Sequence, residues 1–241
     1  MLPRRPATAA GHAPETDLDD AMKEVLTPAN SQLLLIDHQP LPAFAVQSID
    51  RQALKSNVVA LARAARLFDV PTTLSCMRPA DAAGHLLPEL RETFPDHPLL
   101  ERTAINAWEE PAVRHRLADQ GRRKLIVAGL WTDTSAVSFG LAARREANYE
   151  IHVVADASGA SSRAVQDAAL RRLRQTGAVP LTWRQVLLEW QQHRGPHDAA
   201  RQVSELLTRY GASLPRARPA GTNRPETVAA RRSAGRASGQ N

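Results

Sequence analysis

Three side chains capable of chemistry stand at or just beyond the ends of apolar runs in this 241-residue sequence: Asp37, Arg102 and Ser135. In an open parallel sheet, ligands bind beyond the carboxyl ends of the strands, so we expect these three residues to converge. A carboxylate, a guanidinium and a hydroxyl in one place could form a hydrolytic site with a base, a fixed cation and a nucleophile. Each residue also has a simpler interpretation on its own: Asp37 as a loop cap, Arg102 as a surface charge and Ser135 as a helix cap.

The stretch around Ser135 predicts a strand, a tight turn and a helix. The apolar run 125–128 is typical of a strand buried on both faces, and Thr132 or Asp133 then offers a helix N-cap. Ser135 would lie in the first turn of the helix, where unpaired N–H groups and a partial positive charge could hold an oxyanion. An ordinary β–α turn with a capping serine is the alternative.

Predicted strands and helices alternate along the chain, and Pro40 and Pro42 predict a loop after the first strand. The predicted strands cover 32–36, 70–76, 99–102, 125–128, 149–154 and 179–181. The predicted helices cover 50–68, 86–94, 109–121, 135–145, 161–175, 184–193 and 198–210. This order implies an α/β fold with a parallel sheet, right-handed crossovers and helices on both faces.

The two ends of the chain differ in composition from its middle. We expect a disordered segment at 1–30, one α/β domain at 31–194, a C-terminal helix at 195–211 and a basic disordered tail at 212–241. The tail has six arginines and one acidic residue, so it carries +5 of the net charge of +6. It has no aromatic residue to stack on bases. Nucleic acid is therefore not an expected partner, and any contact with it would involve only this tail.

Several classes of function are not expected from the sequence. No apolar run approaches the ~18 residues of a membrane helix, and the N-terminus lacks the apolar core of a secretory signal. No GxGxxG motif follows a strand, and the histidines are scattered, so we expect no cofactor and no metal. The single cysteine, Cys76, is expected to be a buried structural thiol. A cytoplasmic location is the prediction that follows.

Four ordered motifs resemble the isochorismatase-like cysteine hydrolase family. They are LLLIDHQ at 33–39, INAW at 105–108, VAGLWTDTS at 127–135 and VVADASG at 153–159. The resemblance implies a three-layer α/β/α sandwich, Rossmann-like, with a six-stranded parallel sheet and commonly a homo-oligomeric assembly. It also implies a small-molecule substrate.

The resemblance also assigns roles, with two departures from the family pattern. Asp37 matches the catalytic aspartate, Ser135 stands where the family has its nucleophilic cysteine, and Arg102 stands where it has a lysine. The N–H groups of Trp131 and Ser135 are the implied oxyanion donors, with a cis peptide before Trp131. Asn106 and Trp108 are further candidates for substrate binding.

Two main hypotheses follow. The first is a hydrolase of small amides, esters or vinyl ethers with an altered Asp-Arg-Ser site. The second is a catalytically silent pseudoenzyme that binds a small carboxylate and serves as an oligomeric binding or scaffold protein, since a serine hydroxyl is far less acidic than a thiol. Trp183 and Trp190 add to the expectation of a homo-oligomer, because they could pack against a partner subunit, although packing within their own chain is the alternative.

Overall fold

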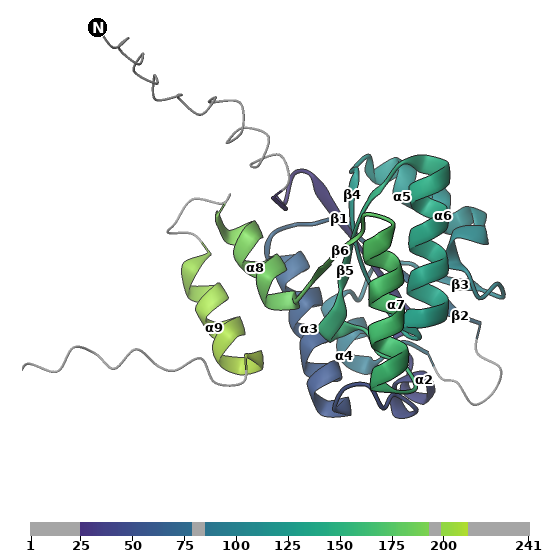
Figure 1. Cartoon of the computed structure of the whole chain (residues 1–241). Helices are drawn as coiled ribbons and strands as arrows, with labels where there is room; N and C mark the ends of the chain where they lie inside the picture. Colours follow the sequence, from purple (N-terminus) through teal and green to yellow (C-terminus); the bar gives the residue numbers. More distant parts are fainter. Residues whose placement is uncertain (1–24, 79–84, 193–198, 212–241) are drawn as a thin grey trace, which may run out of the picture.

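A single six-stranded parallel sheet forms the middle of the molecule (Figure 1). The computed structural model of the chain describes residues 25–78, 85–192 and 199–211. The strand order is β3-β2-β1-β4-β5-β6. The strands are β1 (Ser31–Ile36), β2 (Thr72–Met77), β3 (Leu99–Arg102), β4 (Lys124–Gly129), β5 (Glu150–Val154) and β6 (Val179–Leu181). The predicted fold class is confirmed.

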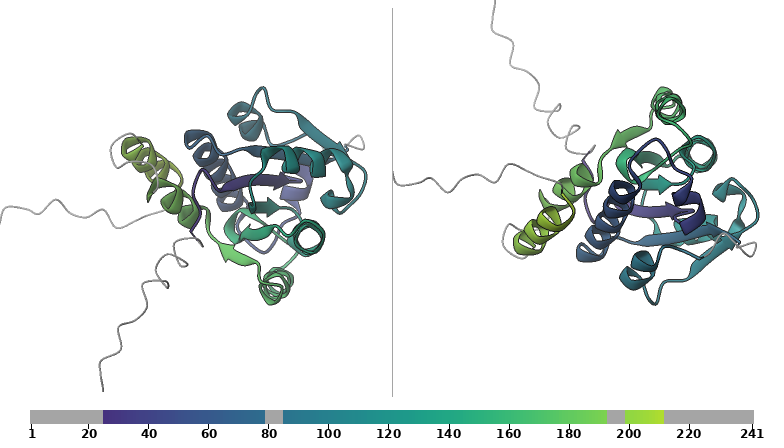
Figure 2. Two further views of the ribbon diagram at one scale, coloured as in Figure 1. Left: turned by 90° about the horizontal axis from the view of Figure 1, so that it is seen from above. Right: turned by 90° about the horizontal axis from the view of Figure 1, so that it is seen from below.

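Helices cover both faces of the sheet, which gives three layers (Figure 2). One face packs against α3 (Arg51–Leu67), α4 (Pro88–Thr93), α8 (Trp183–Gln192) and α9 (Ala200–Tyr210). The other packs against α5 (Pro111–Gln120), α6 (Val137–Ala147) and α7 (Arg163–Gln175). The remaining elements are α2 (Pro40–Phe44), the 3-10 turns η1 (Ala107–Glu109) and η3 (Ala155–Ala157), and the π-helical turn η2 (Thr132–Ala136).

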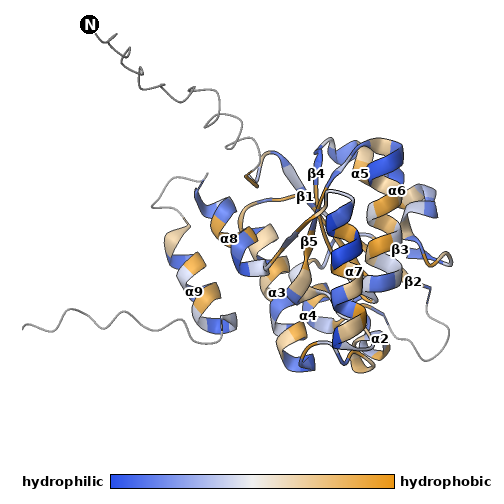
Figure 3. Cartoon of the chain, in the orientation of Figure 1, coloured by the Kyte–Doolittle hydropathy of each residue, from blue (hydrophilic) through white to orange (hydrophobic). Residues whose placement is uncertain are grey.

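The apolar runs of the sequence become the central strands because both of their faces are covered. Every residue of β1 and of β4 is buried. Along β1, Leu33 and Leu35 pack on the α3 side, whereas Leu34 and Ile36 pack on the α5 side, as the two-residue period of a strand requires. In Figure 3 these strands are mostly hydrophobic, whereas an outer helix such as α7 has both hydrophilic and hydrophobic residues.

The chain runs outward from the middle of the sheet in two directions. From β1 it proceeds to β2 and β3 on one side, and then returns to β4, β5 and β6 on the other. The strand order therefore reverses between β1 and β4. Crevices at such reversal points, beyond the carboxyl ends of the strands, are where open α/β sheets bind ligands.

Side chains cap the first turns of two long helices, and a glycine follows the end of one of them. The side chain of Asp50 accepts a hydrogen bond from Ala53 N–H and begins α3, and Ser162 does the same for α7. Gly177, just beyond α7, has φ +81°. The loop predicted after β1 is wrong in part, because the two prolines lie in the short helix α2, where the fixed φ of Pro40 suits the first helical position.

The predicted start of the domain needs correction, and of the two alternatives for the tryptophans the structure supports packing within their own chain. Residues 25–30 belong to the ordered fold, because Leu26 is fully buried and its N–H donates to the carboxylate of Glu189 at 2.8 Å. Trp183 and Trp190 are buried within their own chain, and Trp190 Nε1 donates to Ser31 Oγ at 3.0 Å. They therefore do not supply a surface for a partner. The disorder predicted at 1–24 and at 212–241 falls outside the described residues.

None of the helices that the structure describes combines the length and the apolar character that a bilayer crossing needs.

Candidate active site

Asp37 begins the loop that leaves the carboxyl end of β1. Its φ of +58° lies in the left-handed region, which aspartate tolerates better than most residues. The backbone on both sides is held, because Asp37 N–H donates to Ser75 O at 2.9 Å and Asp37 O accepts from Gln39 N–H at 2.7 Å. The carboxylate is held as well, since Oδ1 accepts from Met77 N–H at 2.8 Å. Asp37 is therefore fixed by the end of β2.

Arg102 reaches Asp37 from the end of β3, two strands away. Its Nη2 forms an ion pair and hydrogen bond with Oδ2 of Asp37. Its Nη1 donates to Ala104 O at 2.8 Å and to the sulfur of Met77. The guanidinium is thus oriented by groups from β2 and from the loop after β3.

Ser135 comes from η2, the π-helical turn between β4 and α6. Its Oγ lies 3.1 Å from Oδ2 of Asp37 and 3.1 Å from Leu130 O. A hydroxyl has one proton and therefore donates to one of these oxygens at a time. The three residues predicted to converge are brought together at the reversal point of the sheet.

The cap predicted for this turn is wrong. No side chain caps η2, Asp133 is exposed, and Thr132 Oγ1 donates to Gly159 O at 3.1 Å instead. The N–H of Ser135 is not free, because it donates to Trp131 O at 2.8 Å. The N–H of Trp131 has no acceptor within the described ranges, and the Leu130–Trp131 peptide is cis.

The cluster is closed to solvent in the single chain. Asp37, Arg102 and Ser135 have exposed fractions of 5%, 1% and 3%. Burial raises the pKa of the Asp37 carboxyl above its usual range, and the Arg102 charge, the Met77 N–H and the Ser135 hydroxyl oppose that rise. A carboxylate with a raised pKa is a stronger base than an exposed one.

Next to this cluster, His38 is a neutral and buried neighbour. Its Nε2 lies 2.9 Å from Ala157 O, and burial lowers its pKa to about 4. It lines a cavity of about 250 Å³ together with Leu130, whose carbonyl accepts from Ser135. None of Asp37, Arg102 and Ser135 lines this cavity, so it offers space for a small molecule beside the cluster, next to His38 and Leu130.

Comparison with known proteins assigns the family. The model of the isochorismatase domain matches residues 31–185, which is more than half of the chain. The chain belongs to the isochorismatase family. YcaC of Escherichia coli K12, named as a probable hydrolase, is 33% identical over 187 residues, covering 77% of this chain and 87% of YcaC.

Two solved structures of family members are similar to this chain. YcaC from Pseudomonas aeruginosa, solved with hexane-2,5-diol and covalent acrylamide, has a TM-score of 0.73 and 32% identity, covering 78% of this chain and 92% of that one. YcaC from E. coli, described as an octameric hydrolase of unknown specificity, has a TM-score of 0.73 and 31% identity, covering 78% and 91%.

Asn106 and Trp108, the two further candidates for substrate binding in this isochorismatase-family chain, make contacts within the protein. The Asn106 side chain caps η1 by accepting from Trp108 N–H at 3.1 Å. The Trp108 indole is buried against Phe139 and Tyr149, and its Nε1 donates to Glu146 at 2.8 Å. Both residues therefore have structural roles, and substrate binding by them stays a prediction.

Sequence reasoning missed Met77 and Leu130 as parts of the site. Both act through backbone groups, the N–H of Met77 on Asp37 and the carbonyl of Leu130 near Ser135. Backbone groups are the same in every residue type, so no sequence signal marks them. Within the described part of the chain, no cluster of three or more His, Cys, Asp or Glu side chains is placed to bind a metal ion.

Proposed function

We propose that the chain is a hydrolase of small amides, esters or vinyl ethers, with Ser135 as nucleophile and Asp37 as its base. The observation that carries the proposal is the 3.1 Å approach of Ser135 Oγ to Oδ2 of Asp37, whose basicity burial increases. A base within hydrogen-bond reach is the first requirement for activating a hydroxyl. The neighbouring cavity of about 250 Å³ suits a small substrate.

For an amide or ester, the proposed reaction has two stages. Asp37 takes the hydroxyl proton as Ser135 Oγ attacks the carbonyl carbon, and the carbonyl oxygen becomes an oxyanion. The Trp131 N–H, which has no acceptor in the described part of the chain, is available to donate to it. The proton then passes from Asp37 to the leaving group. Water hydrolyses the acyl-enzyme by the same route in reverse.

Arg102 acts in this scheme as a fixed cation. It holds the Asp37 carboxylate in place and stabilises negative charge near the reacting atoms, but it does not exchange protons. The same ion pair favours a second function, in which the chain binds a small carboxylate and catalyses nothing. The Arg102 guanidinium stabilises the ionised form of Asp37 through Oδ2, which is the atom that would accept the proton of Ser135. The ion pair therefore makes Asp37 a weaker base.

Hydrolysis assays distinguish the two functions. We expect p-nitrophenyl acetate or a small amide such as acrylamide to be turned over by the wild type, and we expect Ser135→Ala to lose at least ~100-fold in kcat/KM, as for loss of a nucleophile. Thr134→Ala is the matched control, because Thr134 is an exposed neighbouring hydroxyl. Equal rates in wild type and Ser135→Ala favour the binding protein. Saturable binding of acetate without turnover supports it directly.

We also propose that the chain is a homo-oligomer. The E. coli relative described as octameric shares 31% identity with it over most of both chains. A cytoplasmic location and the absence of nucleic-acid partners remain predictions from the sequence, and the basic tail on which the latter depends lies beyond residue 211.

A further inference from the structure

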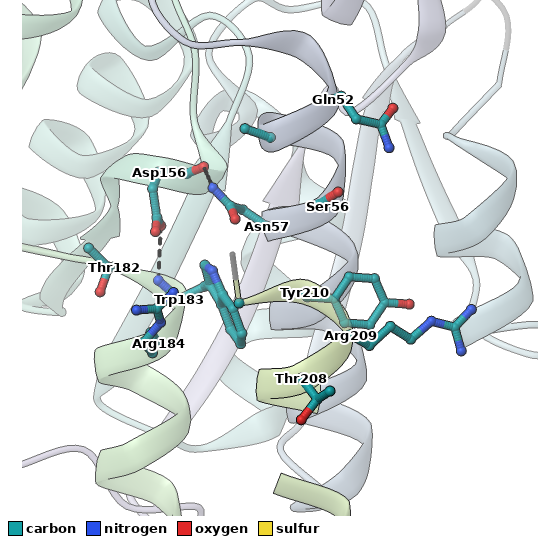
Figure 4. Close-up of a pocket in the computed structure, with 12 residues that line it drawn as sticks. Gln52, Ser56, Asn57, Asp156, Thr182, Trp183, Arg184, Thr208, Arg209 and Tyr210 are labelled. Carbon is teal, nitrogen blue, oxygen red and sulfur yellow. Dashed lines mark hydrogen bonds between the residues drawn. The ribbon is translucent and has the colours of Figure 1, made fainter. Parts of the chain in front are cut away.

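A second cavity lies at the same edge of the sheet. It is not lined by Asp37, Arg102 or Ser135, and Gln52 is the one described residue that it shares with the cavity of about 250 Å³. Its volume is about 660 Å³. Its walls come from the first turns of α3, from η3 after β5, from the start of α8 after β6, and from the end of α9 (Figure 4). It therefore lies beyond the carboxyl ends of β5 and β6, at the edge of the sheet where ligands of α/β folds bind.

Hydrogen bonds hold the polar wall of this cavity in place. The Oδ1 atom of Asp156 accepts from Trp183 N–H at 2.9 Å, and Asn57 Nδ2 donates to Asp156 O at 2.8 Å. These two bonds join α3, η3 and the first residue of α8, as Figure 4 shows. The wall is thus formed before any ligand arrives, which reduces the entropy that binding costs.

Arginines give the cavity an excess of positive charge. Arg184 and Arg209 line it, and Arg63 lies beside it with its guanidinium 5.5 Å from the Tyr210 ring centre. Among the residues that the structure describes, none of the three forms an ion pair with a carboxylate. Asp156 is the single acidic residue of the lining; its Oδ1 already accepts a hydrogen bond, and its charge interacts with that of Arg184. One carboxylate against several guanidinium groups leaves an excess of positive charge, which favours an anionic ligand.

Aromatic surface accompanies that charge. The Tyr210 ring lies on one wall (Figure 4), with Arg209 5.4 Å from its centre. The neighbouring Trp183 ring has Arg184 5.9 Å from its centre but is only 2% exposed, so Tyr210 supplies most of the aromatic surface. A ring placed here gains apolar contact, while its charged group meets a guanidinium.

We propose that this cavity binds a small anion made of a flat ring and a carboxylate or phosphate group. Arg184 receives the anionic group, and the ring packs against Tyr210. The chain's own residues 212–241, which continue from Gly211 in the cavity wall, are a poor occupant. They carry six arginines and one acidic residue, so they would meet like charge.

Calorimetric titration of the full-length chain tests the proposal with benzoate, phenyl phosphate and the neutral benzamide. We expect saturable binding of one or both anions, with benzamide at least ~10-fold weaker. Arg184→Gln should weaken anion binding at least ~10-fold, whereas Arg171→Gln, an exposed arginine on α7, should leave it unchanged. Asp156→Asn should tighten it, because an amide oxygen can still accept from Trp183 while the negative charge is removed.

The two anions show which charged group the ligand carries. Tighter binding of benzoate indicates a carboxylate ligand, and tighter binding of phenyl phosphate indicates a phosphate ligand. Binding that is unchanged in Ser135→Ala supports a site distinct from the proposed active site. The proposal is overturned by no saturable binding of either anion, by equal binding of benzamide, or by an Arg184→Gln variant that binds normally. Loss of binding in Ser135→Ala, or binding that appears only after residues 212–241 are removed, overturns it too.

Discussion

The hydroxyl of Ser135 lies 3.1 Å from Oδ2 of Asp37, although 98 residues separate the two in the chain. The parallel order of β1 and β4, which are adjacent in the sheet, creates this approach. If the turn is arranged to stabilise an anion, a thiol at position 135 should be reactive. The Ser135→Cys variant should therefore be alkylated by iodoacetamide much faster than Cys76, whose pKa burial raises to about 11.

Peptide mapping by mass spectrometry measures that reaction, and Thr134→Cys provides an ordinary exposed thiol for comparison. The Arg102 charge favours the thiolate at position 135, whereas the Asp37 charge opposes it. We expect the cation to dominate, because an arginine guanidinium acts as a fixed cation in proteins. A thiol at position 135 that reacts no faster than the one at position 134 would show that the turn does not activate a nucleophile.

Removing the cation from the buried ion pair should destabilise the fold. Arg102→Leu leaves the Asp37 carboxylate buried without its charge partner, and we expect a loss of ~3–5 kcal/mol in the free energy of unfolding. Urea denaturation measures it. Arg201→Leu is the control, because that arginine forms an exposed pair with Glu205 and should cost less than ~1 kcal/mol.

A double variant tests the cause of that loss. Asp37→Asn combined with Arg102→Leu removes both charges, and asparagine can still accept from Met77 N–H. We expect the double variant to be more stable than Arg102→Leu alone, because no unpaired charge is then buried. If both variants lose the same amount, the packing of the Arg102 side chain matters more than its charge.

The decrease in the free energy of unfolding at acidic pH should depend in part on His152. Burial, assisted by the charge of Lys124, lowers the pKa of His152 from 6.5 to about 4. Between these values the unfolded chain binds a proton that the folded chain does not, so the free energy of unfolding falls as pH falls. A pKa difference of this size corresponds to ~3 kcal/mol for the single ring.

Urea denaturation at several pH values measures this slope. His152→Gln should reduce the slope between pH 6.5 and about 4 without abolishing it, because His38 has a similarly lowered pKa, whereas His115→Gln, at an exposed position on α5, should not change it. The lowered pKa values of His38 and His97 act in the same direction, and the raised pKa values of Asp37 and Asp156 act in the opposite one. All four groups are present in both wild type and variant, so their effects cancel in the comparison. An unchanged slope in His152→Gln would refute the assignment.

The pH dependence of hydrolysis should report on Asp37. Asp37 must be ionised to accept the proton of Ser135, so kcat/KM should rise with pH through the pKa of that carboxyl. Because burial raises this pKa, the rise should lie above the range of an ordinary aspartate. A kcat/KM profile that is flat down to strongly acidic pH would be inconsistent with Asp37 as the base.

Light scattering tests the assembly. The chain has a mass of 26.3 kDa, and we expect a solution mass several times larger at micromolar concentration. A solution mass equal to that of one chain would contradict the homo-oligomer.

The central strands could be predicted from the sequence because burial on both faces leaves an unbroken apolar run, as in β1 and β4. The positions of Asp37, Arg102 and Ser135 then followed from the rule that parallel strands end at one edge. The helix α2 and the π-helical turn η2 could not be predicted. Their geometry depends on contacts such as Thr132 N–H with Gly159 O, which join distant parts of the chain.

The direction of side chains was the harder problem. Trp108 is the last residue of the INAW motif but packs into the core, and Trp190 lies on an apolar helix face that its own chain covers. An amphipathic pattern indicates that a face is buried but does not identify what covers it. The left-handed backbone of Asp37 gave no signal either, since aspartate is also common in ordinary loops.

The hydroxyl at position 135 affects how sensitive the protein is to oxidation. The chain's one sulfhydryl, Cys76, is fully buried, and burial keeps it protonated at neutral pH. Peroxide and other electrophiles that attack thiolates therefore find no ready target near Asp37. A hydrolase built on Ser135 should keep its activity under oxidative stress that would inactivate an enzyme with a thiolate nucleophile.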